Sequence, residues 1–246
     1  MKKYELTYEY ITRSGFSLFR IRALVDIGRS VRAGDLGGFV ESEKNLSHLG
    51  SSWVGGNARV YGNATVSGDS LVTDESRVGG ESQICGESII RGNAIISGSA
   101  LIDENASVHD EASVTSHAIV RGHASVGDHA HITDHALIDG NAGIGSNAKI
   151  FCDTIIRGDT EIYCDAHTSY GALIESNEDI LTITGLGTMH RTTTAYRTRD
   201  KEIMITCGCF RGGVKAFERQ VISTREGKVR KEYLKLAELI RIYFSK

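Results

Sequence analysis

Histidine is the residue type whose spacing in this sequence best suits acid–base chemistry. His117, His123, His129 and His135 follow one another at intervals of six residues. An imidazole group titrates near neutral pH and can accept or donate a proton during a reaction. A general base also needs a partner that orients it and a pocket that excludes water, and the residues around these histidines supply neither. The alternative is that each histidine is a polar turn residue.

A polar and basic segment near the C-terminus is a candidate for binding rather than catalysis. His190 and Arg191 are followed by Arg197, and these side chains are suited to a phosphate or another anion. The alternative is a solvated strand face. A further basic group between Arg225 and Lys235 is typical of a solvated helix face, so we do not expect binding to nucleic acid.

Cysteine and histidine spacing predicts no metal site and no cofactor. A single residue separates the thiols of Cys207 and Cys209, which is not the spacing of a zinc knuckle or a thioredoxin motif. A packed strand end is the favoured interpretation of this segment.

The four histidines must be positioned by a repeat that occupies half of the chain. From Val54 to Ile174, every sixth residue is Val or Ile, with Thr168 the one exception. Two residues before each of these positions stands Ala, Ser or Thr. A period of six fits neither a single helix nor a single long strand, but it fits a short strand and a turn repeated many times. The chain has 28 Gly and no Pro, so glycine and asparagine are expected to make the turns.

The consensus of the repeat resembles that of hexapeptide-repeat proteins. Good copies are Val60-Tyr61-Gly62-Asn63-Ala64-Thr65 and Ile90-Arg91-Gly92-Asn93-Ala94-Ile95. The resemblance implies a single-stranded left-handed parallel β-helix, a triangular prism of about seven coils with 18 residues in each. It also implies that His117 and His135 stack on one corner. Many members of this class are acyltransferases that use acyl-CoA, so His117 or His135 is the candidate base under that alternative.

One outward face of the expected prism carries a regular series of apolar residues, which we call the apolar row. Its members are Leu101, Ile119, Leu137, Ile155 and Leu173. Beside them, Asp103, Arg121, Asp139 and Arg157 alternate in charge, which predicts a ladder of ion pairs. An exposed apolar series of this length needs a partner. Hexapeptide-repeat proteins commonly form homotrimers, so a second and third copy are expected to cover the row, with the C-terminal helix of the same chain as the alternative.

The segments outside the repeat predict two flanking units. Residues 1–45 are expected to form a β cap with strands over 3–12 and 16–24 and a glycine-rich turn at 34–38. Residues 46–175 form the β-helix. Residues 176–246 form an α+β domain with three strands, over 179–184, 192–198 and 201–207, and helices over 214–223 and 231–243.

The whole layout resembles a family of phage, prophage and bacterial hexapeptide-repeat proteins that are often labelled transferases or polymer-forming proteins. The resemblance rests on the Gly34–Glu41 segment, on Trp53 and on Cys207-Gly208-Cys209-Phe210. With a formal charge of -3, five cysteines and no apolar N-terminal segment, we expect a cytoplasmic protein away from membranes. The leading hypothesis is a non-catalytic oligomeric binding or scaffold protein, acting on a host protein or a small nucleotide signal.

Overall fold

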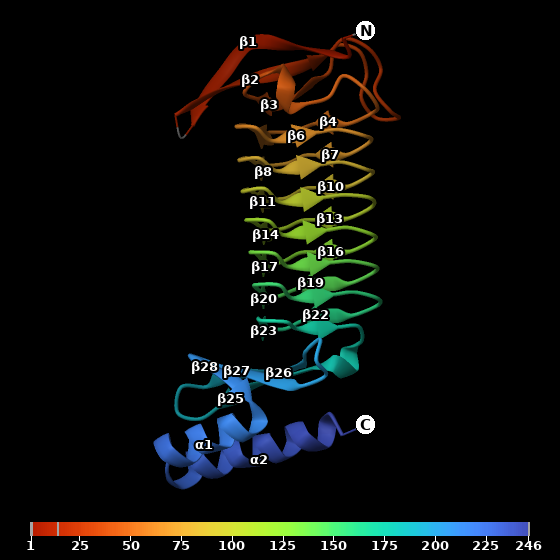
Figure 1. Ribbon diagram of the computed structural model, residues 1–246. Helices are drawn as coiled ribbons and strands as arrows, with labels where there is room; N and C mark the ends of the chain where they lie inside the picture. The colour runs from red at the N-terminus through yellow and green to blue at the C-terminus, as the bar shows by residue number, and fades with distance from the viewer. Residues whose placement is uncertain (1, 14, 246) are drawn as a thin grey trace.

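The protein is a parallel β-solenoid of the left-handed β-helix type, closed at each end by a different β structure (Figure 1). The structure is a computed structural model that describes residues 2–13 and 15–245. Among these residues the prism strands pair in register with strands 18 residues away, as in Leu101 with Ile119. The prediction of a triangular β-helix with 18-residue coils is confirmed.

The three faces of the prism are parallel sheets whose strands recur in chain order. The first face contains β5 (Arg59–Val60), β8 (Arg77–Val78), β11 (Ile95–Ile96), β14 (Ser113–Val114), β17 (His131–Ile132), β20 (Lys149–Ile150) and β23 (His167–Thr168). The second contains β4 (Trp53–Val54), β7 (Leu71–Val72), β10 (Ile89–Ile90), β13 (Ser107–Val108), β16 (Ser125–Val126), β19 (Gly143–Gly145) and β22 (Glu161–Tyr163). The third contains β6 (Thr65–Val66), β9 (Gln83–Ile84), β12 (Leu101–Ile102), β15 (Ile119–Val120), β18 (Leu137–Ile138), β21 (Ile155–Ile156) and β24 (Leu173–Ile174).

The six-residue pattern forms this prism because each inward position is fully removed from water. The Val and Ile of the repeat, and the Ala, Ser and Thr two residues before them, form one buried core. Each buried aliphatic side chain contributes about 1.5–3 kcal/mol relative to exposure. Serine is tolerated at these positions because its hydroxyl donates to the carbonyl three residues earlier, as Ser76 Oγ does to Thr73 O at 2.6 Å.

The corners of the prism need a residue with positive φ. Where that residue is not glycine, an aspartate can stabilise the conformation through a side-chain hydrogen bond. Gly122 and Gly140 have φ of 74° and 69°, whereas Asp128 and Asp134 occupy equivalent corners with φ of 52° and 60°. The carboxylate of Asp128 accepts a hydrogen bond from the backbone N–H of Ser146, one coil further on, at 2.6 Å. This bond offsets the cost of about 1–2 kcal/mol that a side chain incurs in the left-handed region.

The N-terminal cap extends the first face of the prism. Strands β1 (Tyr4–Arg13) and β2 (Phe16–Ala23) form an antiparallel hairpin, and β2 pairs with β3 (Leu36–Val40). The turn expected at 34–38 is therefore only partly correct, since Leu36 begins a strand. Strand β3 pairs in parallel with β5, Val40 opposite Val60, so that an additional, irregular coil precedes the regular ones. A 3-10 turn, η1 (Glu43–Asn45), lies within this coil.

Lys3 joins the cap to the first coil. It is 5% exposed, and its ammonium donates to the carbonyl of Ser52 at 2.7 Å and to Ser52 Oγ at 3.1 Å. Burial lowers the pKa of Lys3 to about 8, partly opposed by the charge of Asp69.

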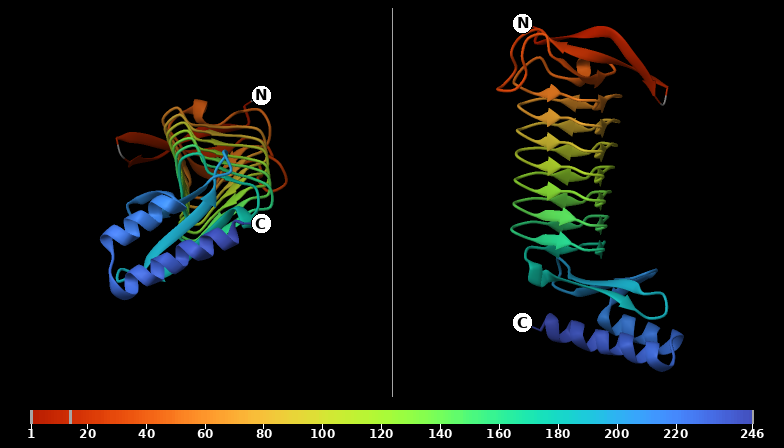
Figure 2. Two further views of the ribbon diagram at one scale, coloured as in Figure 1. Left: turned by 60° about the horizontal axis from the view of Figure 1, so that its bottom comes forward. Right: turned by 180° about the vertical axis from the view of Figure 1, so that it is seen from behind.

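The C-terminal domain lies across the other end of the prism (Figure 2). A 3-10 turn, η2 (Asn177–Asp179), leads into the antiparallel strands β25 (Ile180–Leu186), β26 (Arg191–Arg197), β27 (Ile203–Cys207) and β28 (Phe210–Gly213). Helices α1 (Val214–Thr224) and α2 (Gly227–Tyr243) pack on this sheet in a separate core. Strand β28 was not predicted from the sequence. Helix α2 begins four residues before the predicted start at residue 231, because 227–230 contains one apolar residue and shows no helical periodicity.

Strands β26 and β27 join this domain to the last coil. The Tyr196 side chain is fully buried in the core of the prism, and its hydroxyl lies 3.2 Å from Ser169 Oγ. Thr206 Oγ1 donates to the carbonyl of His167 at 2.7 Å. The sheet therefore closes the end of the hydrophobic column and holds the two helices away from the prism faces. No helix within the described residues is long and apolar enough to cross a membrane.

Candidate anion-binding site

A cleft of about 500 Å³ opens in the C-terminal domain between the β27–β28 turn and the helices. Three arginines line it, and we call it the arginine cleft. Its polar and apolar lining consists of Arg191, Cys207, Cys209, Phe210, Arg211, Phe217, Gln220, Val221, Thr224, Arg225 and Tyr233. The volume lies within the range usual for small-molecule sites.

Three different elements bring the arginines together. Arg191 is the first residue of β26, and its guanidinium lies against the backbone of Gly208, where a side-chain Cβ would collide with it. Gly208 has φ of 58°, so it makes the β27–β28 turn and also leaves room for Arg191. Arg211 extends from β28 toward the last coil, where its guanidinium lies 5.7 Å from the ring centroid of Tyr170. Arg225 follows α1.

The positive charge of this cleft is not neutralised within the described part of the chain. Arg191, Arg211 and Arg225 take part in none of the ion pairs found among these residues, and the cleft lining itself contains no carboxylate. Guanidinium groups are rigid, always charged and suited to bidentate bonds with phosphate or carboxylate oxygens. Arg225 Nη1 donates to the carbonyl of Thr224 at 3.4 Å and Arg211 lies over the Tyr170 ring, so no carboxylate of the cleft lining has to be displaced before an anion can enter.

Aromatic side chains form the inner wall of the arginine cleft. Phe210 and Phe217 have ring centroids 5.2 Å apart, and Phe217 meets Tyr233 edge to face at 5.9 Å. The Tyr233 hydroxyl donates to the carbonyl of Leu186 at 3.3 Å. Burial, followed by the neighbouring Cys207, raises the pKa of Tyr233, while the charges of Arg191 and Arg225 oppose the rise. Tyr233 is therefore a neutral wall of the cleft at physiological pH.

A second cavity adjoins the first across shared residues. It has a volume of about 440 Å³ and shares Arg191, Thr224, Arg225 and Tyr233 with the arginine cleft. Thr188, Met189 and Val229 line its far side together with Glu226. Arg191 and Arg225 thus stand between two cavities, where they can reach the middle of a ligand that extends into both.

Of the three residues that the sequence singled out for anion binding, only Arg191 lies in the cleft. His190 is exposed in the β25–β26 turn with φ of 47°. Arg197 Nε donates to Asp179 Oδ1 at 3.0 Å, and its guanidinium lies 5.5 Å from the ring centroid of Phe244, so its charge is already paired. Arg211 and Arg225 complete the site instead. Arg225 belongs to the basic group that was expected to be a solvated helix face, and no motif marks Arg211, because both meet Arg191 only through the fold of the domain.

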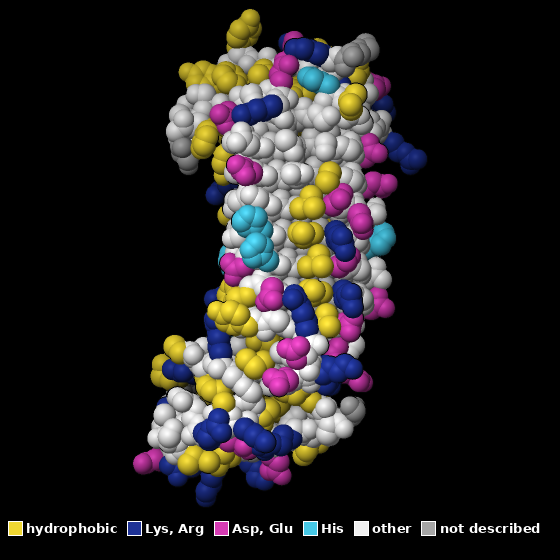
Figure 3. All heavy atoms as spheres, in the orientation of Figure 1, with side chains coloured by type: hydrophobic (Ala, Val, Ile, Leu, Met, Phe, Trp, Pro, Cys, Tyr) yellow, Lys and Arg dark blue, Asp and Glu magenta, His cyan; other side chains and the backbone are white. Residues whose placement is uncertain are grey.

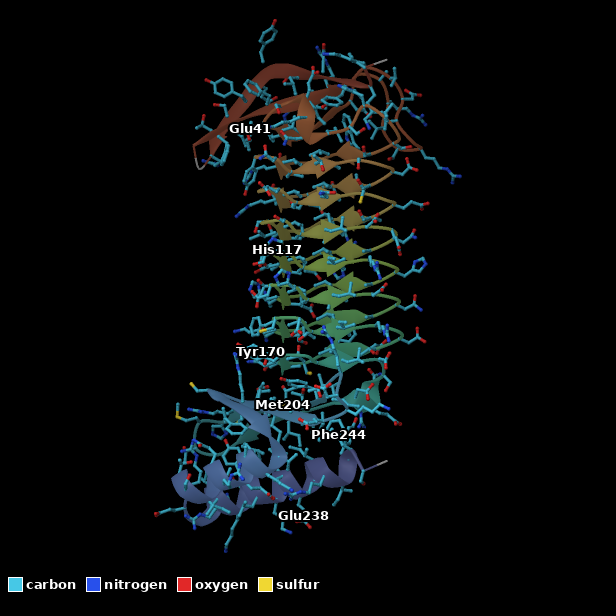
Figure 4. All side chains as sticks on the ribbon, in the orientation of Figure 1. Glu41, His117, Tyr170, Met204, Glu238 and Phe244 are labelled. Atoms are coloured by element: carbon cyan, nitrogen blue, oxygen red, sulfur yellow. The ribbon has the colours of Figure 1, made fainter. Side chains whose placement is uncertain are left out.

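The stacked histidines lie on the prism, away from this cleft. His117 and His135 have ring centroids 4.9 Å apart at an angle of 20°, which is the corner stack expected for residues one coil apart. Figure 4 labels His117, which lies midway along the prism. Both side chains are exposed, and neither lines a cavity found in the described chain. On a single copy both imidazoles are therefore open to solvent.

The apolar row runs down the third face and is not covered by the C-terminal helices, which pack in their own core. Figure 3 shows a column of hydrophobic side chains on the prism with charged side chains of both signs alongside it. The ladder of ion pairs exists in part. Arg121 pairs with Asp139 at 2.8 Å and Arg157 pairs with Glu175, whereas Asp103 accepts from the backbone of Glu104.

Within residues 2–13 and 15–245, no group of three His, Cys, Asp or Glu side chains lies close enough together to hold a metal ion. Cys207-Gly208-Cys209 is the β27–β28 turn, with Cys207 buried and Cys209 exposed. Thr193 Oγ1 donates to Cys207 Sγ at 3.1 Å. The favoured interpretation of this segment as a strand end is confirmed.

The fold and the cleft define a β-solenoid whose C-terminal domain carries a cleft lined by three arginines. Comparison with known protein families finds no match for this chain, and comparison with curated proteins finds none either.

Proposed function

We propose that this chain is a non-catalytic β-helical binding protein whose arginine cleft takes a small phosphate-bearing ligand, most suitably a nucleotide. The observation that carries the proposal is the meeting of Arg191, Arg211 and Arg225, none of them in an ion pair within the described chain, beside an aromatic wall. The arginines suit phosphate oxygens, and the partly exposed Phe210 ring offers an apolar surface to a planar base.

The rest of the molecule supports a role in binding a ligand or a partner protein rather than in catalysis. The resemblance to phage and bacterial hexapeptide-repeat proteins makes sequestration of a nucleotide signal, or binding to a host protein, the setting we favour. The five cysteines are all unpaired, which fits the cytoplasmic location that we propose. We also propose a homotrimer in which the apolar row is covered by neighbouring copies, because the C-terminal helices of the same chain leave it open.

Acyl transfer from acyl-CoA is the alternative function, with His117 or His135 as the base. It would require a groove between two prisms, since both side chains are exposed on a single copy. The contact found for the two rings within the described residues is their stack on each other, and neither donates a hydrogen bond to a carboxylate there that would orient it for proton transfer. We therefore place binding ahead of catalysis.

Titration calorimetry with ADP at constant ionic strength tests the proposed function. We expect ADP to bind, and the double variant Arg191→Gln/Arg225→Gln to weaken binding about tenfold or more, because charge-assisted hydrogen bonds are lost. Arg219→Gln is the matched control, since Arg219 is exposed on α1 and lines none of these cavities. Binding that is absent in the wild type, or equal in the wild type and the double variant, would contradict the proposal.

A further inference from the structure

A second basic cavity lies at the opposite end of the molecule, beneath the N-terminal hairpin. Figure 1 shows the β1–β2 hairpin reaching out beside the prism. Between the hairpin and the first face lies a hollow of about 260 Å³, lined by Arg13, Phe16, Leu18, Arg59, Tyr61 and Arg77. We call it the hairpin pocket. It shares no residue with the arginine cleft.

Two of its arginines are forced together by the register of the repeat. Arg59 and Arg77 are directly paired positions on β5 and β8, so their side chains leave the same face from adjacent strands. Like charges at such positions repel each other and destabilise a sheet. On the next strand of this face the paired residue is Ile95, so the sheet supplies no acid at that position.

Internal acids balance this charge only in part. Glu75 accepts from Arg59 Nη2 at 3.4 Å, but the same carboxylate also accepts from Asn57 Nδ2 at 2.7 Å. Arg59 Nε is buried and has no hydrogen-bond partner within the described residues. Arg13 and Arg77 take part in none of the ion pairs found in that part of the chain. Buried donors are normally paired, so the Arg59 Nε–H group indicates a missing acceptor.

The remaining wall of the hairpin pocket is aromatic and limits the size of the occupant. Phe16 and Tyr61 already pack together, with ring centroids 5.2 Å apart. Tyr61 lies across Gly79, where a Cβ atom would approach its ring to 2.5 Å. The space that is left is smaller than a usual drug-sized site, which favours a compact ion over a nucleotide.

We infer that the hairpin pocket binds a single phosphate-sized oxyanion, held by Arg13, Arg59 and Arg77. The ion supplies the acceptor that Arg59 Nε lacks and screens the repulsion between Arg59 and Arg77. Because Arg13 comes from the hairpin and the other two arginines from the prism, the ion also fastens the N-terminal cap to the first coils.

Phosphate binding in a chain with the arginine cleft disabled tests this inference. In the Arg191→Gln/Arg225→Gln background, inorganic phosphate is titrated against chloride at equal ionic strength, by calorimetry and by thermal unfolding. We expect phosphate to bind and to raise the unfolding midpoint. Adding Arg77→Gln should weaken phosphate binding about tenfold or more, and should raise the midpoint in phosphate-free buffer by removing the repulsion from Arg59.

Arg91→Gln provides the control, because it removes the same charge from an exposed prism position outside the pocket. We expect it to leave phosphate affinity within about twofold. The inference is overturned if phosphate fails to bind in this background, if Arg77→Gln leaves the affinity unchanged, or if Arg91→Gln weakens it as much. Loss of ADP binding at the arginine cleft has no bearing on these outcomes, so the two proposals fail separately.

Discussion

At the scale of single residues, an inward polar side chain is tolerated in the repeat when its hydroxyl has a hydrogen-bond partner. Ser76 and its equivalents donate to the carbonyl three residues earlier, as Thr154 Oγ1 also does to Phe151 O at 2.8 Å. Thr168 differs, because it occupies a position that is otherwise Val or Ile. Its side chain is fully buried, and Thr168 Oγ1 has no hydrogen-bond partner among the described residues.

Thr168→Val should therefore stabilise the protein. The substitution removes an unpaired buried hydroxyl and restores the repeat, and we expect the free energy of unfolding to rise by about 1 kcal/mol. Urea unfolding followed by circular dichroism measures the change. Thr168→Ser is the control, since it keeps the hydroxyl, deletes a buried methyl group and should destabilise the chain. A loss of stability in Thr168→Val would show that the hydroxyl has a partner.

Residue patterns made the prism predictable but not the sites. The strands, faces and corners between Val54 and Ile174 could be predicted, because the same buried positions, filled by small or β-branched side chains, recur every six residues. The irregular coil that contains β3 does not follow the period of the repeat, because Val40 lies 20 residues before its partner Val60 instead of 18. The arginine cleft could not be predicted, since Arg191, Arg211 and Arg225 have no common spacing and meet only through long-range sheet pairing.

At the scale of elements, the N-terminal cap depends on a lysine held in an environment that disfavours its charge. In the unfolded chain the pKa of Lys3 returns to about 10.5, whereas in the folded protein it lies near 8. Between these values the unfolded chain holds a proton that the folded protein has released. The contribution of Lys3 to the free energy of unfolding therefore increases as pH rises from about 8 toward 10.5.

A comparison of wild type with Lys3→Met isolates this effect. Tyr4 and Cys85 have raised pKa values, mainly through burial, and both act in the opposite direction at alkaline pH, but they are common to the two proteins. We expect the stability difference between wild type and Lys3→Met to shift in favour of wild type from pH 8 to pH 10. Chemical unfolding at several pH values measures it. A difference that is constant over this interval would contradict the assignment.

At the scale of the whole molecule, the prism presents one face that is apolar along five coils. On the first face the exposed Ile95 stands alone, between Arg77 and Ser113 of the neighbouring strands. Leu137→Glu/Ile155→Glu should dissociate the trimer that we propose, because two charges would enter the centre of its interface. The mass measured by light scattering should then fall from three times the 26.7 kDa chain mass to the mass of a single chain.

Ile95→Glu, on another face, is the control and should leave the mass unchanged. An unaltered mass in the double variant would reject the apolar row as the interface.

Protection of Cys209 from alkylation would show whether a phosphate-bearing ligand occupies the arginine cleft, as we propose. Cys209 is exposed and lines the cleft, whereas Cys85 and Cys152 lie on the prism and serve as internal references. Alkylation of each thiol is followed by mass spectrometry with and without ADP. At ten times the Kd of ADP, about one cleft in ten is free, so alkylation of Cys209 should slow about tenfold while the references keep their rates. An unchanged rate at Cys209 under conditions where calorimetry shows bound ADP would place the ligand outside the arginine cleft and rule out the proposed site.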